Sequence, residues 1–201
     1  MSTRKAIIPT GMEAVYDKIH YAPGVLVGNT LYVSGQIGRD ENMQLVEGTE
    51  AQIVKGMYLL QEGGQGLPKG QAGNAPRVQL LGSGTILRES IAAQELLAAD
   101  WGVQADVWSC PSFNELARDG QNAERFNLLH PLETPRVPFV GQQLAKHSGP
   151  VVASTDYMKA YAEQIRPFIP KGRTYKVLGT DGFGRSDFRS KLREHFEVNR
   201  H

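Results

Sequence analysis

Four short apolar runs, each followed by a stretch with helical spacing, constrain what this chain can fold into more than any other feature. The runs are VQLLG (78–82), ADVWS (105–109), PVVAS (150–154) and YKVLG (175–179). Strands of this kind are buried on both faces of a sheet, and the intervening helices supply the crossovers that parallel strands require. Residues 77–201 are therefore predicted to form an α/β domain with a mostly parallel sheet.

The helices expected between these strands follow from apolar spacing and from capping residues. Residues 85–99 carry one broad apolar stripe, and Ser112 with Glu115 forms a capping box for a helix through Arg118. The remaining helical patterns cover 122–129, about 156–168 and a last segment that starts near Ser186.

Residues 1–47 are predicted to be strands. Residues 25–27 and 31–34 are rich in β-forming residues and surround Gly28-Asn29, a plausible tight turn, and residues 6–8 form a further strand. So small a set does not make a domain, because two or three strands need a helix or a partner sheet to cover their apolar face.

Residues 48–62 are predicted to form one helix, continuous over about 49–61. Ile53, Met57 and Leu60 recur there at positions i, i+4 and i+7. Glycine and proline crowd the stretch that follows, 63–76, which is predicted to be a flexible linker.

Composition excludes several classes of function. The chain of 201 residues has 22 basic and 21 acidic residues and a formal net charge of +1, so it has no electrostatic footprint for nucleic acid or an anionic membrane. No apolar run approaches the roughly 20 residues of a membrane span, and the first residues lack the apolar segment of a signal peptide. The single cysteine fits a reducing compartment. We expect a soluble, cytoplasmic protein without nucleic-acid or membrane partners.

Ligands of α/β sheets bind beyond the carboxyl ends of the strands, so the loops there hold the candidate sites. Gly82, Ser83 and Gly84 lie between a strand and a helix, where backbone N–H groups could bind an anion. A dinucleotide fingerprint would need a third glycine where Leu87 stands. A Rossmann cofactor site is therefore disfavoured, and a tight strand-to-helix turn is favoured.

The second candidate loop is VLGTDGFGRSDFR, residues 177–189. Its polar residues Asp181, Arg185 and Asp187 could line the mouth of an active site or a subunit interface. A glycine turn ordered by an Asp/Arg pair explains the same residues equally well.

Cysteine and histidine spacing predicts neither a nucleophile nor a metal site. Cys110 follows an apolar strand and has no histidine near it in sequence, which favours a buried, inert thiol. Metal-ligand spacing is absent among the histidines His20, His130, His147, His195 and His201.

Longer strings of residues 47–201 are similar to a known family. The resemblance is to the C-terminal domain of the homodimeric-type pyruvate dehydrogenase, and it is carried by VQLLGSGTILRE, SFNELARDGQNAERFNLLHPLETPRVPF, VVASTDYMKAYAEQIR and VLGTDGFGRSD. That enzyme is the thiamine-diphosphate-dependent first component of its complex. The resemblance implies a transketolase-type C-terminal domain that packs in a homo-oligomer and carries no thiamine diphosphate or magnesium ligands. The family continues beyond HFEVNRH, so a truncated domain is expected.

The N-terminal region resembles a different family. The strings YAPGVLVGNTLYVSGQIGRD and EGTEAQ are similar to the opening of Rid-family proteins, the reactive intermediate deaminases. In that resemblance Tyr21 matches a pocket tyrosine and Ser34 lies at the signature strand end, whereas the family's carboxylate-binding arginine has no counterpart. The two resemblances meet inside the predicted helix, so the chain is interpreted as a chimera.

Three functions follow from these resemblances. The favoured one is a fragment of the pyruvate dehydrogenase first component, which serves assembly and binds neither thiamine diphosphate nor pyruvate alone. The parent enzyme would decarboxylate pyruvate oxidatively, transfer the acetyl group to lipoyl, and have the other components of the complex as partners. The alternatives are a Rid-like enamine or imine deaminase and a non-catalytic interaction domain.

Overall fold

The computed structural model describes residues 4–7, 24–27, 30–33, 49–64 and 75–201. The chain divides into two units, Met1–Ala51 and Gln52–His201, and each is described by itself. Some predicted features lie outside the described residues, namely the tight turn at 28–29, most of the linker, Tyr21 and Ser34.

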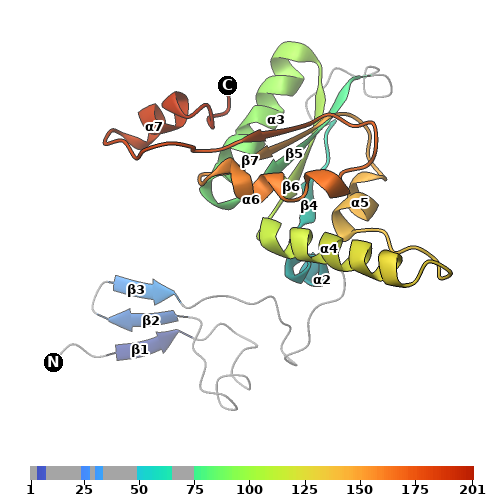
Figure 1. Ribbon diagram of the computed structural model, residues 1–201. Coiled ribbons are helices and arrows are strands. Elements are labelled where there is room, and N and C mark those ends of the chain that lie inside the picture. The colour runs from blue at the N-terminus through green and yellow to red at the C-terminus, as the bar shows by residue number, and fades with distance from the viewer. Residues whose placement is uncertain (1–3, 8–23, 28–29, 34–48, 65–74) are drawn as a thin grey trace. The chain divides into compact units, whose positions relative to one another are not determined.

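The elements of Figure 1 are short strands and helices that alternate along most of the chain. In chain order they are β1 (Arg4–Ile7), β2 (Gly24–Val27), β3 (Thr30–Val33), α2 (Thr49–Val54), β4 (Tyr58–Gln61), β5 (Arg77–Gly82), the 3₁₀ helix η1 (Gly84–Ile86), α3 (Leu87–Trp101), β6 (Gln104–Ser109), α4 (Phe113–Leu129), α5 (Phe139–Leu144), β7 (Val151–Ser154), α6 (Lys159–Glu163), the 3₁₀ helix η2 (Arg166–Phe168), β8 (Tyr175–Leu178) and α7 (Arg189–His195). No helix within the described ranges is long and apolar enough to cross a membrane.

The first unit contains a three-stranded antiparallel sheet in the order β1-β2-β3. Val25 pairs with Ala6 on one side and with Tyr32 on the other. The predicted strands of residues 1–47 are thereby confirmed, since all three lie within one or two residues of their expected positions.

The second unit contains a five-stranded sheet in the order β4-β6-β5-β7-β8. Strands β5, β6, β7 and β8 run parallel to one another, and β4 pairs with β6 antiparallel. Gly82, Ser154 and Leu178 are neighbours in register, so the carboxyl ends of three strands meet at one edge of the sheet. The predicted α/β class is confirmed, as are the four predicted parallel strands.

The predicted continuous helix over 49–61 is wrong. Helix α2 ends at Val54, and the residues from Tyr58 onward form a strand that covers the edge of β6. The helix ends before Gly56, because the backbone of this residue has φ of +102°, which is not helical. Glycine is needed there, since an added Cβ would lie 2.5 Å from the carbonyl oxygen of Ser112. Met57 follows this turn and is fully buried. It is apolar because it packs in the core just before β4 begins, and its four-residue spacing from Ile53 does not indicate a helix.

Three further helix boundaries differ from expectation. The two helices expected around 112–118 and 122–129 are a single helix, α4, whose predicted cap is confirmed because Ser112 Oγ accepts a hydrogen bond from the Glu115 amide at 3.2 Å. The stretch 156–168 holds only the short α6 and η2, since Pro167 has no N–H with which to continue the α-helical hydrogen bonds. The last helix begins at Arg189.

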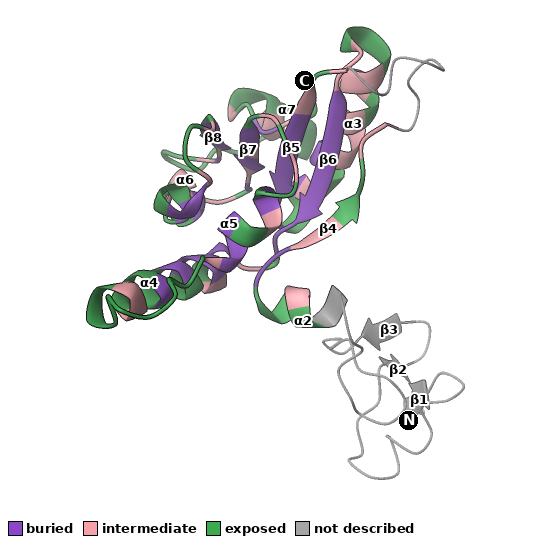
Figure 2. Ribbon diagram, turned by 90° about the vertical axis from the view of Figure 1, so that its right-hand side faces the viewer, coloured by how far each residue is buried: buried purple, intermediate pink, exposed green. Residues whose placement is uncertain are grey.

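Two apolar cores lie on the opposite faces of this sheet. Leu81 and its neighbours on one face pack with residues of α4, α5 and α6, whereas Leu80 on the other face packs against α3. This alternation along β5 produces the nearly continuous buried strip through the middle of the sheet in Figure 2. The unit is therefore a three-layer α/β/α arrangement (Figure 1).

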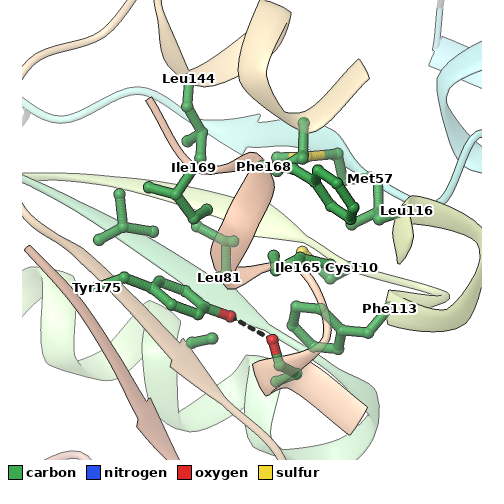
Figure 3. Close-up of a cluster of buried hydrophobic side chains, with 14 of the residues drawn as sticks. Met57, Leu81, Cys110, Phe113, Leu116, Leu144, Ile165, Phe168, Ile169 and Tyr175 are labelled. Atoms are coloured by element: carbon green, nitrogen blue, oxygen red, sulfur yellow. Dashed lines mark hydrogen bonds between the residues drawn. The ribbon is translucent and has the colours of Figure 1, made fainter. Parts of the chain in front are cut away.

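The core on the α4 side is closed by aromatic and aliphatic side chains (Figure 3). The Tyr175 hydroxyl donates a hydrogen bond of 2.7 Å to the Ala162 carbonyl oxygen, which satisfies the one polar atom of this ring. Cys110 is 1% exposed in the same core, and burial raises the pKa of its thiol well above its ordinary value. The burial and the raised pKa agree with the inert thiol expected from the sequence.

A buried carboxylate anchors the amino ends of the strands. Asp106 is fully buried and accepts hydrogen bonds from the Gly63 amide at 2.7 Å, from Gln79 Nε2 at 2.7 Å and from Arg77 Nη1 at 2.9 Å. His147 Nδ1 lies 3.1 Å from Asp106 Oδ2, the same oxygen that accepts the hydrogen bond from Gln79. Burial raises the pKa of Asp106, but these hydrogen bonds and the arginine charge outweigh it and hold the pKa below its ordinary value.

Candidate functional site

A pocket of about 320 Å³ opens beside the edge where β5, β7 and β8 end. This is the position at which α/β sheets bind ligands. Side chains and backbone of three loops and of α7 surround it. They are Thr85, Ile86, Asp156, Thr180, Gly182, Gly184, Arg185, Arg189, Leu192, Arg193, Phe196 and Val198, and we call this the arginine pocket.

The Gly82-Ser83-Gly84 turn packs tightly beneath this pocket. An added Cβ on Gly82 would lie 2.8 Å from Leu87 Cα, so glycine is required for the helix to approach the strand. The Ser83 amide donates to the Ser154 carbonyl oxygen, and its hydroxyl bonds to the Tyr157 hydroxyl at 2.9 Å. These contacts favour the tight turn expected from the sequence over anion binding by Gly82, Ser83 and Gly84.

Asp156 provides a fixed negative charge at the mouth of the same turn. Its Oδ2 accepts a hydrogen bond of 2.9 Å from Thr85 Oγ1, and its backbone carbonyl accepts one of 2.8 Å from Thr180 Oγ1. An added Cβ on Gly84, whose φ is +55°, would lie 3.4 Å from Asp156 Oδ1. Asp156 therefore links two loops, through its carboxylate to Thr85 after β5 and through its backbone carbonyl to Thr180 after β8.

The three candidate residues of the second loop have separate roles. Arg185 lines the arginine pocket, whereas the carboxylates of Asp181 and Asp187 accept hydrogen bonds from the amides of Lys159 (2.9 Å) and Phe188 (2.6 Å). Arg185 forms no ion pair with either aspartate, so the structure does not contain the Asp/Arg pair of the alternative interpretation.

Arg189 and Arg193 were not expected from the sequence, and they join Arg185 at the pocket. Arg189 and Arg193 are four residues apart, a spacing that places two side chains on one face of a helix, whereas Arg185 lies in the loop before α7. The alignment becomes visible only once α7 is placed beside the ends of the strands.

Glu89 fixes the segment that carries these arginines. Its carboxylate is 7% exposed and lies 2.7 Å from Arg193 Nη1 and 3.0 Å from Arg200 Nε. The hydrogen bond from Arg200 and the charge of both arginines hold the pKa of Glu89 below its ordinary value, against the opposing effect of burial. Helix α3 is thereby tied to α7 and to the residues that follow it.

Metal-binding groups do not gather near this pocket. No cluster of three or more histidine, cysteine, aspartate or glutamate side chains has the arrangement of a metal site within the ranges the structure describes. His130 lies against Glu133 at 2.9 Å and His147 against Asp106 at 3.1 Å, so both have local partners.

A three-layer α/β unit with one antiparallel edge strand, and with polar loops at the carboxyl ends of its parallel strands, defines the class of domain. The chain belongs to the family described as transketolase-like TK C-terminal domain, whose model matches residues 56–199. The match begins at Gly56, where α2 gives way to β4, and spans all five strands of the sheet. The transketolase C-terminal-like fold expected from the sequence is confirmed.

Among curated proteins, the chain is similar to segments of the pyruvate dehydrogenase E1 component. It is 60% identical over 161 residues to that of Cupriavidus necator, covering 80% of this chain and 17% of the relative. It is 49% identical over 195 residues to that of Escherichia coli K12, covering 96% of this chain and 20% of the relative. The chain thus spans about a fifth or less of the length of these relatives.

A solved transketolase from Campylobacter jejuni aligns with 87% of this chain and 20% of its own, at a TM-score of 0.44 and 17% identity.

The Escherichia coli match covers 96% of the chain and so extends into residues 1–47. These comparisons give no support to a Rid-family segment or to a chimera, and that interpretation rests on its sequence strings alone.

Proposed function

We propose that this chain is the C-terminal-domain segment of a pyruvate dehydrogenase first component, and that the segment serves the assembly of the enzyme. The observation that carries the proposal is the 60% identity over 161 residues with the Cupriavidus necator E1 component. The parent would be cytoplasmic and homo-oligomeric, would use thiamine diphosphate and magnesium, and would act with the other components of its complex. Its reaction is the oxidative decarboxylation of pyruvate with acetyl transfer to lipoyl.

The contacts of this chain support a structural role for the segment. Its buried polar groups are engaged with one another, as Asp106 is with Gln79 and Glu89 with Arg193. The thiol of Cys110 lies in an apolar core without a base. Asp106, Glu89 and Cys110 do not line the arginine pocket, and Arg193, which does, is paired with Glu89.

The described residues do not fit thiamine diphosphate held through magnesium. Such a site needs oxygen ligands for the metal and a carboxylate that activates the aminopyrimidine. The string most similar to a metal motif, Thr180-Asp181-Gly182, has its carboxylate directed at the Lys159 amide and 3.9 Å from the Lys159 ammonium. We therefore assign no step of the reaction to this chain alone.

An exchange of segments tests the proposal. Residues 56–199 replace the corresponding segment of the Escherichia coli E1 component, and assembly and pyruvate oxidation are measured. We expect an assembled enzyme within about tenfold of the original rate, a difference of about 1.4 kcal/mol in the barrier. A matched control carries Gly149→Val, which would place Cβ 1.7 Å from the Arg77 carbonyl oxygen, and should not assemble.

Each outcome of the exchange is informative. An enzyme that assembles normally but is inactive would contradict a purely structural role. An enzyme that fails to assemble, like the control, would contradict the assignment of the segment.

The Rid-like interpretation of residues 1–47 is a separate proposal, because only their sequence supports it. Hydrolysis of an enamine or imine by that family needs an arginine to hold the substrate carboxylate, and no stretch of this chain resembles the family's arginine motif. We expect no acceleration of 2-aminoacrylate hydrolysis by the chain. A rate that rises in proportion to its concentration would restore the deaminase as a function.

A further inference from the structure

Positive charge is in excess at the arginine pocket. Arg185 and Arg189 make no hydrogen bond or ion pair with any residue that the structure describes, although both line the cavity. Arg193 is paired with Glu89, and that carboxylate is shared with Arg200. The one acidic side chain in the lining, Asp156, is hydrogen-bonded to Thr85. Arg185 and Arg189 therefore have no ion-pair partner, and the single carboxylate of Asp156 leaves the lining with a net positive charge.

Guanidinium groups in this arrangement select a particular kind of ligand. Each presents a planar set of N–H donors that matches the oxygens of a phosphate or carboxylate, and two donors can bind one anion at once. Clustered like charges repel, so an anion between them is stabilised more than it would be beside one arginine.

The inner wall of the pocket is apolar. Ile86 and Val198 are 1% and 2% exposed, and Leu192 and Phe196 lie beside them in the lining. A cavity of about 320 Å³ is at the lower end of the range for small-molecule sites, which combine apolar walls with few polar anchors. The charged rim and the apolar wall would therefore contact different parts of one ligand.

From these observations we infer that the arginine pocket is a binding site for a small organic anion, with its phosphate or carboxylate at Arg185 and Arg189 and its apolar body against Ile86 and Leu192. The proposed function gives this pocket no ligand, and the inference does not depend on that function. A divalent cation is disfavoured, because three arginines surround the cavity. An acidic protein segment is the competing occupant, since Phe183 and Phe188 on the same loop are 94% and 81% exposed.

Titration of the full chain with phenyl phosphate tests the inference, because this probe carries one anion and one apolar ring. We expect saturable binding with a dissociation constant on the order of 0.1–1 mM in low salt, followed by calorimetry or amide chemical shifts. Inorganic phosphate and benzoate are the other arms, which separate the contribution of the ring from that of the anion. Both should bind more weakly than phenyl phosphate, and phenol should not bind.

Matched variants locate the binding. The double substitution Arg185→Gln and Arg189→Gln should weaken phenyl phosphate at least tenfold, since each removes a charge-assisted contact. Arg125→Gln is the control, because Arg125 is also exposed, has no described partner and does not line the pocket. Arg185, Arg189 and Arg125 are all exposed, so glutamine is tolerated at each position, and thermal unfolding of each variant verifies that it folds.

Absence of saturable binding up to about ten times the expected constant would exclude the site. Equal weakening by Arg125→Gln and by the double variant would show diffuse charge attraction instead of a pocket. Binding of a glutamate-rich peptide at lower concentration than any small anion, lost in the double variant, would replace the small ligand by a protein segment.

Discussion

Replacement of Asp106 by alanine should destabilise the α/β unit by about 3 kcal/mol. Removing one partner of a buried ion pair costs about 3–5 kcal/mol, because the remaining groups stay buried without an acceptor. In this variant the Gly63 amide and His147 Nδ1 both lose the Asp106 carboxylate as their hydrogen-bond partner. Gln79 still donates to the Ser148 carbonyl oxygen at 3.0 Å. The side chain of Arg77 is 29% exposed and can be hydrated, which places the cost at the lower end of that range.

Urea unfolding followed by tryptophan fluorescence measures this cost. Trp108 is 1% exposed and donates a hydrogen bond of 2.7 Å to Gln79 Oε1, so its emission reports on the network. With a slope of about 2–3 kcal/mol per molar urea, the midpoint should fall by about 1–1.5 M. Asp100→Ala, at an exposed position of α3, is the control and should change stability by less than about 0.5 kcal/mol. A loss below about 1 kcal/mol for Asp106→Ala would show that the buried carboxylate does not hold these groups together.

The same carboxylate makes a prediction about pH. The pKa of Asp106 is lower in the folded chain than its ordinary value of 3.8, so the unfolded chain binds its proton first as the pH falls. Its contribution is therefore complete above pH 3.8 and is lost as the pH falls through the folded value. The difference in the free energy of unfolding between the native chain and Asp106→Asn should therefore shrink below pH 3.8. A difference that stayed constant as the pH fell would contradict a charged Asp106 in the folded chain.

Three further predictions concern other parts of the unit. Gly149→Ala should destabilise the unit by more than about 2 kcal/mol, because the new Cβ would overlap a backbone carbonyl oxygen at 1.7 Å. Gly172→Ala, with a similar φ of +81° but open space around it, should cost only about 1–2 kcal/mol. Equal midpoints of the two variants in thermal unfolding would be inconsistent with this difference. Cys110 should resist iodoacetamide in the native chain and react after denaturation, because burial keeps it protonated, and mass spectrometry distinguishes the two cases. Glu89→Gln should weaken its two ion pairs and accelerate amide exchange over residues 189–201; unchanged protection there would show that other contacts hold the segment.

The parallel strands could be predicted from the sequence because their signal is local. A run such as 151–153, Val-Val-Ala, has no polar face to expose, so burial on both sides is the natural solution. Strand β4 could not be predicted in this way. The spacing of Ile53, Met57 and Leu60 fits a helix, and what decides otherwise is the positive φ of Gly56 and the pairing of Tyr58 with a strand some fifty residues away.

The candidate site was only partly predictable for a related reason. Arg185 belongs to a loop whose glycines and charges mark a strand end, so it was identified as a candidate. Arg189 and Arg193 lie in an ordinary charged helix, and their role depends on which face of α7 meets the ends of the strands. Pairing between Glu89 and Arg193 spans 104 residues and has no sequence signature at all.

Calorimetric titration of the full chain with thiamine diphosphate, in the presence and absence of magnesium, tests whether this chain carries cofactor ligands of its own. We expect no magnesium-dependent binding, because the described residues hold no cluster of metal ligands and Asp181 accepts a hydrogen bond from the Lys159 amide. Weak, magnesium-independent binding that is lost in the Arg185→Gln/Arg189→Gln variant would belong to the arginine pocket. Saturable binding on the order of micromolar that requires magnesium and persists in that variant would contradict the account, since it would show that this chain carries cofactor ligands of its own.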